Sequence, residues 1–287
     1  MPRSNGRSAT PDASWSASST VPPVARAAVA GAAALVFAGC AAPRIILPEG
    51  PGTPLADYAE LFDAAADPCR RVRTLELVLA IEGETGDTRL RGRVRGALAR
   101  PASLRLEGVA PFGAPAFILV AGESPAVLVL PRERRVVTDA TGRDLLQLLA
   151  GLPLEPADLR AVLTGCLVPH PMPVAARTYS NGWVGVQLDG EATLYVDRAG
   201  GAPVIVAGRR QGLVVAYGDH VRGMPRRVHV RSAPPGGVAT DLTATLSQVS
   251  INVEIDARAF ARVVPRDFTP TSIDTLRPEA GPLAATP

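Results

Sequence analysis

The sequence predicts a mostly β fold with some α: a long antiparallel sheet with helices lying across one face. Residues 74–82 and 89–98 alternate apolar and polar side chains with a period of two, which is typical of half-buried strands. Turn signals such as Asn181-Gly182 separate a series of similar segments. Two leucine-rich segments in the middle of the chain have helical spacing instead.

The strands of this sheet are predicted from the alternation and from the turns between segments. In residues 89–98, one face carries Leu90 and Val94, and the other is a stripe of arginines. A solvated outer face accounts for the stripe better than contact with anionic lipid does. The expected strands are residues 74–82, 89–98, 103–109, 116–121, 126–130, 175–180, 183–188, 192–196, 203–208, 213–217, 226–231 and 240–252, and the stripe is Arg89, Arg91, Arg93 and Arg95.

A helix is expected before the first strand. Thr53 suits its N-cap, Pro54 suits its first turn, and Pro68 is expected to end it. One face at helical spacing is apolar and consists of Leu55, Tyr58, Phe62 and Ala65.

Two further helices are expected between the strands. Thr141 and Asp144 form a pattern like a capping box at the start of the first, and Gly151 ends it. The second runs from about residue 156 to 164 and ends at Gly165. Helices with one apolar face, lying on a sheet with one apolar face, either pack a dry core or enclose an apolar pocket.

The N-terminal segment indicates export. A polar region ending at Arg26 is followed by a short apolar run from Ala27 to Phe37, and then by Ala-Gly-Cys40. This is the pattern of a secretory signal peptide over residues 1–39, and the run is shorter than the ~20 residues that span a bilayer. Small residues directly before a cysteine resemble the bacterial lipobox, although Phe37 departs from its usual leucine.

The lipobox resemblance implies acylation of Cys40 as the only covalent group, with no other cofactor. Two or three acyl chains would anchor the protein firmly, because each buried methylene contributes about 0.8 kcal/mol. Ala41, where an aspartate would signal inner-membrane retention, favours the outer membrane, facing the periplasm; the outer leaflet of the inner membrane is the alternative. A plain signal peptide with an incidental cysteine is the competing interpretation.

The mature chain is expected to have three parts. Residues 40–52, rich in proline and glycine, would be a tether, residues 53–268 one domain, and residues 269–287 a disordered tail. All 30 basic residues of the chain are arginine, and there are 27 acidic residues. Cleavage before Cys40 removes three arginines and one aspartate, which leaves a net charge near +1, so bulk charge does not indicate nucleic-acid binding.

The mature chain has two cysteines besides Cys40. Cys69 and Cys166 each follow a predicted helix end, and an exported protein meets an oxidising compartment. A disulfide between them is therefore expected, and it would stabilise the fold by about 4–5 kcal/mol on the chain-entropy model. Two buried free thiols are the alternative.

No pattern in the sequence indicates catalysis or a metal site. His170, His220 and His229 lack a metal-ligand spacing, and their expected roles are structural. There is no nucleophile elbow, phosphate-binding loop or dinucleotide fingerprint. We therefore expect a non-enzymatic protein that binds or transfers a ligand.

The loop from Gly108 to Pro115 is unusual because its tip is apolar. It reads GVAPFGAP, has no charged or hydrogen-bonding side chain, and places Phe112 between Pro111 and Gly113. An exposed Phe112 would forgo about 1.5–3 kcal/mol of burial. Exposed apolar groups of this kind mark membrane or partner contact, whereas a loop folded into the core would hide them.

Three stretches together resemble LolB, the outer-membrane lipoprotein receptor, and the wider group of LolA-like lipoprotein carriers. The first is residues 105–113, RLEGVAPFG, and the second is LLQLLAGLPL at 145–154 followed by DLRAVLTG at 158–165. The third combines LVVAYG at 213–218, MPRRVH at 224–229 and VSIN at 249–252.

The resemblance implies a half-open antiparallel barrel covered by about three helices, with an apolar cavity for acyl chains. It implies that the protein accepts acylated lipoproteins from a LolA-like periplasmic carrier and inserts them into membrane lipid. The loop Pro111, Phe112 and Gly113 matches the family's insertion loop, with Phe112 in place of its leucine. A lipoprotein that binds another amphiphile, such as a glycolipid, and a structural envelope lipoprotein are the alternatives.

Overall fold

The structure is a computed structural model that describes residues 46–123, 125–235 and 237–276. The chain divides into residues 1–44 and residues 45–287, and the described residues all belong to the second unit. The predicted signal peptide, residues 1–39, and the predicted lipidation site Cys40 lie outside the described residues.

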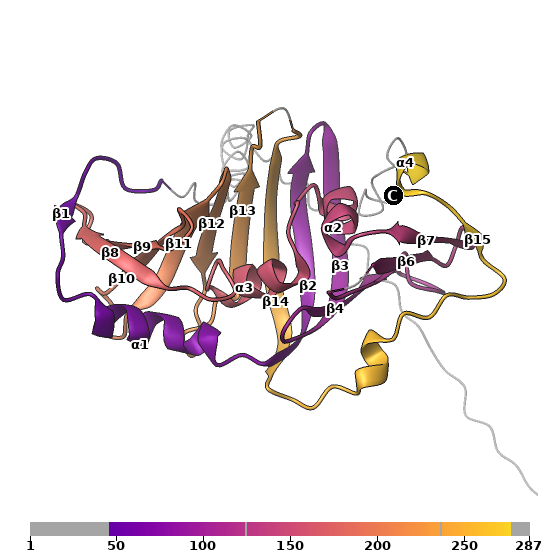
Figure 1. The fold of residues 1–287 in the computed structure, drawn as a ribbon, viewed down its shortest axis with the longest axis horizontal. Coiled ribbons are helices and arrows are strands. Elements are labelled where there is room, and N and C mark those ends of the chain that lie inside the picture. The colour runs from indigo at the N-terminus through magenta and orange to yellow at the C-terminus, as the bar shows by residue number, and fades with distance from the viewer. Residues whose placement is uncertain (1–45, 124, 236, 277–287) are drawn as a thin grey trace, which may run out of the picture. The chain divides into compact units, whose positions relative to one another are not determined.

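The described residues form one sheet of 15 strands (Figure 1). The strand order is β1-β8-β9-β10-β11-β12-β13-β14-β2-β3-β4-β5-β6-β7-β15, and the sheet does not close on itself. The strands are β1 (Thr53–Pro54), β2 (Thr74–Thr85), β3 (Thr88–Ala99), β4 (Ser103–Val109), β5 (Ile118–Ala121), β6 (Ala126–Leu130), β7 (Arg135–Ala140), β8 (Pro173–Thr178), β9 (Val184–Leu188), β10 (Thr193–Asp197), β11 (Val204–Arg210), β12 (Leu213–Gly218), β13 (Arg227–Ser232), β14 (Thr240–Ile251) and β15 (Thr269–Pro270).

The sheet consists of two antiparallel meanders joined side by side. Strands β2 to β7 form one and β8 to β14 the other, and β14 pairs with β2 to unite them. In β2, Leu75, Leu77 and Leu79 are buried, whereas Glu76 and Ala80, on the opposite face, are exposed. This alternation gives the sheet one apolar face, as the sequence predicted.

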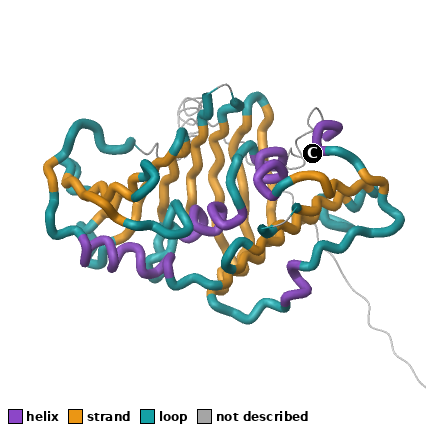
Figure 2. Tube along the Cα trace, in the orientation of Figure 1, coloured by secondary structure: helices purple, strands orange, loops and turns teal. Residues whose placement is uncertain are grey.

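The helices lie over the apolar face of the sheet and share one core with it (Figure 2). Three of them fall where the sequence placed helices, so the predicted class, an open curved sheet covered by about three helices, is confirmed. They are α1 (Ala59–Arg70), α2 (Gly142–Ala150) and α3 (Pro156–Thr164), and two short elements follow near the C-terminus, the 3-10 turn η1 (Ala257–Phe260) and α4 (Ile273–Leu276).

The prediction for the first helix was wrong at both ends. Thr53 and Pro54 form the edge strand β1, which pairs with β8, and the backbone N–H of Leu55 donates to the carbonyl of Ala176. Proline is tolerated on an edge strand because one side of such a strand needs no ladder hydrogen bond. Pro68 lies inside α1, two residues before the helix ends, so it does not terminate the helix.

The predicted boundary between domain and tail at residue 268 was also wrong. Residues 269–270 form β15, which pairs in parallel with the unpredicted strand β7, and α4 buries Leu276 in the core. The domain therefore extends at least to residue 276, and residues 277–287 lie outside the described residues. β1 pairs with β8 and β15 pairs with β7, at the two ends of the sheet. These short strands protect the edges of β8 and β7 from pairing with other chains.

Candidate functional site

An apolar pocket lies between helices α2 and α3 and the inner face of the sheet. Its volume is about 80 Å³, and apolar residues make up its whole lining. The lining residues are Leu79, Ile81, Val94, Leu106, Phe117, Leu146, Leu149, Ala150, Leu152, Leu154, Leu159, Val162, Leu163, Val228, Val230, Leu242 and Ala244. A space lined in this way is expected to stay dry.

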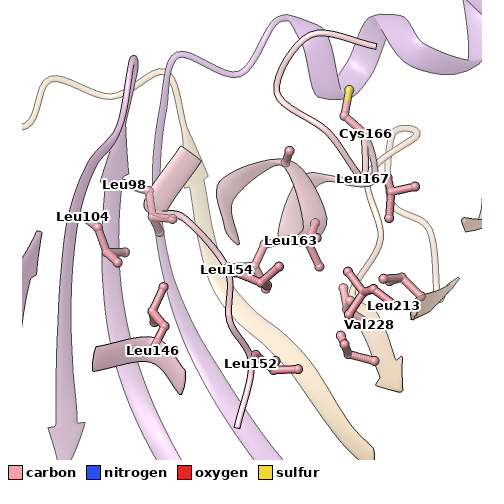
Figure 3. Packing of buried hydrophobic residues seen from close by; sticks show 14 of the residues in the cluster. Leu98, Leu104, Leu146, Leu152, Leu154, Leu163, Cys166, Leu167, Leu213 and Val228 are labelled. Atoms are coloured by element: carbon pink, nitrogen blue, oxygen red, sulfur yellow. The ribbon is translucent and has the colours of Figure 1, made fainter. Parts of the chain in front are cut away.

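Local signals in the sequence position the two helices over this pocket. Thr141 and Asp144 form the predicted capping box at the start of α2. Gly151 and Gly165 end α2 and α3 with φ values of 67° and 97°, in the left-handed region that favours glycine. The connecting residues bring Leu154 close to Leu163 above the strands (Figure 3).

Two threonines of the sheet hold the last turn of α2 against it. The hydroxyl of Thr85 donates to the carbonyl of Ala150 at 3.3 Å, and that of Thr240 donates to the carbonyl of Gly151 at 3.2 Å. A Cβ on Gly151 would lie 2.4 Å from the methyl carbon of Thr85, so only glycine fits there. These contacts fix the last turn of α2 on the sheet beside the pocket.

Cys69 and Cys166 form the disulfide that the sequence led us to expect. Their Cα atoms are 5.7 Å apart, within the usual range for a disulfide. Cys69 lies in the last turns of α1, and Cys166 follows the glycine that ends α3. The disulfide therefore joins the C-terminal end of α3 to α1. Within the described residues, no disulfide holds the N-terminal end of α3.

Arg160 of α3 is a buried cation with poor pairing. Its side chain is 4% exposed, its Nε has no hydrogen-bond partner among the described residues, and one Nη donates to the carbonyl of Val72 at the long distance of 3.5 Å. Burial, and secondarily the charge of Arg100, lower the pKa of Arg160. Arg100 donates from Nε to the same carbonyl at 3.1 Å, so two guanidinium groups meet at one acceptor.

The other flank of α3 carries a well-formed ion pair. Asp158 accepts two hydrogen bonds from Arg210 of β11, at 3.0 and 2.8 Å. Two parallel bonds between a guanidinium and a carboxylate are strong and directional. α3 is thus held by an ion pair on one flank and carries a poorly paired charge on the other.

The loop after β4 exposes its apolar tip. Phe112 is 89% exposed, Pro111 and Gly113 beside it are exposed, and Val109 is 39% exposed. The loop does not fold back into the core, which removes the competing interpretation of its sequence. A weak hydrogen bond of 3.5 Å from Arg132 to the carbonyl of Phe112 links the tip to the neighbouring hairpin.

The remaining candidate residues have structural surroundings. His229 contacts the carboxylate of Asp241 at 2.6 Å, and His220 contacts the carbonyl of Ile205 at 2.9 Å. Within the described ranges, no three His, Cys, Asp or Glu side chains lie close enough together to hold a metal ion. The arginine stripe of β3 is exposed on the outer face of the sheet, as expected, and consists of Arg89, Arg91, Arg93 and Arg95.

Sequence reasoning missed three residues of this site. Arg160 interrupts an apolar run in α3, and this break in the pattern could have marked it as unusual. Its burial, however, depends on α1 and Arg100, which are far away in the sequence. Thr85 and Thr240 gave no signal, because they meet α2 only through the pairing of β2 with β14.

Among the residues that the structure describes, no helix is both long and apolar enough to cross a bilayer.

The fold and the pocket define a class of protein, an open antiparallel sheet whose helices cover an apolar interior. No protein-family model matches the chain, and no curated protein matches it. Among solved structures, it is similar to a LolA superfamily protein from Nitrosomonas europaea, with a TM-score of 0.45 and 10% identity over 72% of this chain and 99% of that one.

Two other similar structures are lipoprotein-related by name. A protein domain named for outer membrane lipoprotein sorting, from Vibrio parahaemolyticus, has a TM-score of 0.38 and 10% identity over 71% of this chain and 94% of that one. The lipoprotein LppX of Mycobacterium tuberculosis has a TM-score of 0.29 and 13% identity over 70% and 100%.

Proposed function

We propose that this protein is an envelope lipoprotein, anchored by lipid on Cys40, that binds acyl chains and inserts lipoproteins into the outer membrane. It would receive its cargo from a LolA-like periplasmic carrier and would act by binding and transfer, without catalysis. The observation that carries the proposal is the wholly apolar pocket beneath α2 and α3, because such a lining suits an acyl chain and offers nothing to a polar ligand.

The pocket must open for this function. At about 80 Å³ it has no room for a whole acyl chain, so binding one requires the pocket to widen. Opening requires the segment from the end of α2 to the start of α3 to leave the sheet. The disulfide at the far end of α3 and the two threonine hydrogen bonds at the end of α2 limit where that movement can occur.

The direct test is uptake of a triacylated lipopeptide by the mature chain with Cys40→Ala, followed by native mass spectrometry. Stoichiometric uptake supports the acyl-chain pocket. If a well-folded sample takes up none, the pocket does not bind acyl chains and the proposal is wrong. Uptake of a glycolipid but not of the lipopeptide would favour the second amphiphile class instead.

Filling the pocket should block uptake. Ala244 of β14 lines the pocket, and Ala244→Leu places three more carbon atoms in it. We expect lipopeptide affinity to fall about tenfold or more, with a stability change within the ~1–3 kcal/mol typical of overpacking. Ala80→Leu on the exposed face of β2 is the matched control and should bind normally. Equal binding by both variants would place the acyl chains elsewhere.

Phe112 is expected to enter the membrane during transfer. Burying a phenylalanine side chain contributes about 1.5–3 kcal/mol, so Phe112→Glu should weaken membrane association about 10- to 100-fold. Because the side chain is 89% exposed, the variant should keep its melting temperature. The measurement is transfer of lipopeptide from the loaded protein to vesicles, with Phe112→Leu as the conservative control; normal transfer by Phe112→Glu would contradict the role.

A further inference from the structure

A second cavity lies on the outer face of the sheet, opposite the acyl-chain pocket. It has a volume of about 480 Å³ and lies over strands β8 to β11, at the end of the sheet that begins with β1 (Figure 1). Small-molecule sites have volumes of roughly 300–1,000 Å³, so this cavity, which we call the outer basin, can hold a ligand. The outer basin is lined by Pro51, Ala175, Ala176, Arg177, Tyr179, Gly185, Gln187, Glu191, Thr193 and Arg209.

The strand register places the outer basin on the face away from the core. Gln187 of β9 lies between the core residues Val186 and Leu188, so its side chain points to the opposite face of the sheet. Cross-strand pairing sets Gln187 beside Thr193 and Thr193 beside Arg209. These three side chains therefore form one row across β9, β10 and β11 on the outer face.

Aromatic side chains form one wall of the outer basin. A Cβ on Gly185 would lie 2.7 Å from the ring of Tyr179, so this ring occupies the space that a side chain at 185 would take. Tyr195 packs against both Tyr179 and Trp183, with ring centroids 6.0 and 6.4 Å away. Tyr195 is buried, although it does not belong to the main core. The aromatic cluster therefore holds Tyr179 in place at the edge of the cavity.

Two arginines border the outer basin from β8 and β11. One Nη of Arg177 donates to the carbonyls of Pro51 and Gly52 at 2.8 and 3.3 Å, and these neutral acceptors orient the guanidinium without neutralising it. Arg209 is exposed and makes no ion pair or hydrogen bond within the described part of the chain. Burial raises the pKa of Tyr195 and the charge of Arg209 opposes that rise, so this guanidinium lies near the phenol. Two strands separate β8 from β11, which sets the arginine backbones about 14 Å apart.

Between the arginines lie groups that exchange hydrogen bonds with hydroxyls. The hydroxyl of Thr193 and the amide of Gln187 both donate and accept, whereas the carboxylate of Glu191 accepts. A ligand that carried only negative charge would be repelled by Glu191. A ligand with acid groups beside hydroxyls suits the whole lining, because its acid groups can face the guanidiniums and its hydroxyls can donate to Glu191.

We infer that the outer basin binds an acidic oligosaccharide, with carboxylates toward the two arginines and hydroxyls toward the polar groups between them. An oligosaccharide carries acid groups at intervals, so it can meet both arginines, and the apolar face of a sugar ring can pack on Tyr179. The inference does not rest on the proposed function, because the outer basin lies on the other face of the sheet and needs no acyl chain.

The test uses a trisaccharide of galacturonic acid, its methyl ester and inorganic phosphate. Titration calorimetry of the mature chain with Cys40→Ala should show that the acid binds at least about tenfold more tightly than the ester, since only the acid can pair with guanidinium groups. Equal affinity for acid and ester, or no binding of either, would overturn the inference. Phosphate at the same concentration should not displace the acid; displacement would reduce the outer basin to a site for any anion and would also overturn it.

Removing one charge from the outer basin should weaken binding. We expect Arg209→Gln to lower the affinity for the acid trisaccharide about five- to tenfold and to leave the melting temperature unchanged, because the side chain is exposed and unpaired within the described residues. Arg91→Gln makes the same charge change on the outer face but outside the outer basin, and it should bind normally. An equal loss in both variants would indicate general attraction by net charge and would contradict a site at β8 to β11.

The two proposals are tested separately. Saturating lipopeptide should leave saccharide binding unchanged, because the two cavities lie on opposite faces of the sheet. A saccharide that lipopeptide displaces would lie in the acyl-chain pocket, which would overturn the inference. Failure of lipopeptide uptake would leave the saccharide result standing, and failure of saccharide binding would leave acyl-chain binding standing.

Discussion

Replacing Cys69 and Cys166 together with alanine is expected to lower the free energy of unfolding by about 4–5 kcal/mol. The two residues are separated by 97 positions, and the chain-entropy model gives ~4.7 kcal/mol for a loop of about 100 residues. The effect is large because the bond joins α1 to the end of α3, two elements that otherwise meet only through side-chain packing. Urea denaturation of the oxidised protein and of the double variant measures the difference.

Chemical reduction provides the control for this prediction. The protein treated with a thiol reductant should unfold at the same urea concentration as the double alanine variant, and the reductant should leave that variant unchanged. An unchanged midpoint on reduction would mean that the two thiols are not paired. A loss much above 5 kcal/mol would indicate that alanine also leaves a cavity, since both cysteines are buried.

The parts of the fold that the sequence predicted well are those that local signals determine. The capping box at Thr141 and the glycines at 151 and 165 specify α2 and α3 without reference to any neighbour. Strict alternation in residues 74–82 and 89–98 likewise identifies β2 and β3, because a slip of one residue would expose the apolar side. Both helices, and these two strands, fall where the sequence placed them.

The parts that were wrong depend on partners far away in the chain. Thr53 and Pro54 suit a helix start as well as an edge strand, and the hydrogen bond from Leu55 to Ala176 decides between them. The segment 135–140 buries Val136 and Val137 on opposite faces, because residues 268–276 cover its outer face and edge. The segment therefore lacks the alternation of a half-buried strand, and its own sequence does not identify it.

The candidate site shows the same division. Phe112 was visible because its loop has no polar side chain, and only the structure shows that the tip is exposed. The residues that line the pocket come from strands and helices far apart in the sequence. Leu79 and Ala244, for example, are separated by 165 positions, so no short stretch of sequence contains the whole lining. The sequence predicted that apolar faces meet, and the structure shows a small apolar pocket between them.

Arg160→Met is expected to stabilise the closed protein by about 1–3 kcal/mol. Replacing buried charges with apolar side chains of similar size is often stabilising by 1–4 kcal/mol, and methionine fills an irregular space well. Arg160 makes one long hydrogen bond and lies beside the like charge of Arg100, so little is lost with the guanidinium. Thermal or urea unfolding of the variant and the parent measures the gain.

The same substitution should slow lipopeptide uptake, which a purely structural role would not explain. Movement of α3 brings the charge of Arg160 into water, so the wild-type residue favours the open form relative to the closed one, and methionine removes that bias. Arg160→Lys keeps the charge and serves as the control: it should gain no stability and take up ligand at a rate near that of the parent. A methionine variant that is more stable yet loads at the parental rate would show that α3 stays in place during loading, and the opening would then have to be assigned to α2 alone.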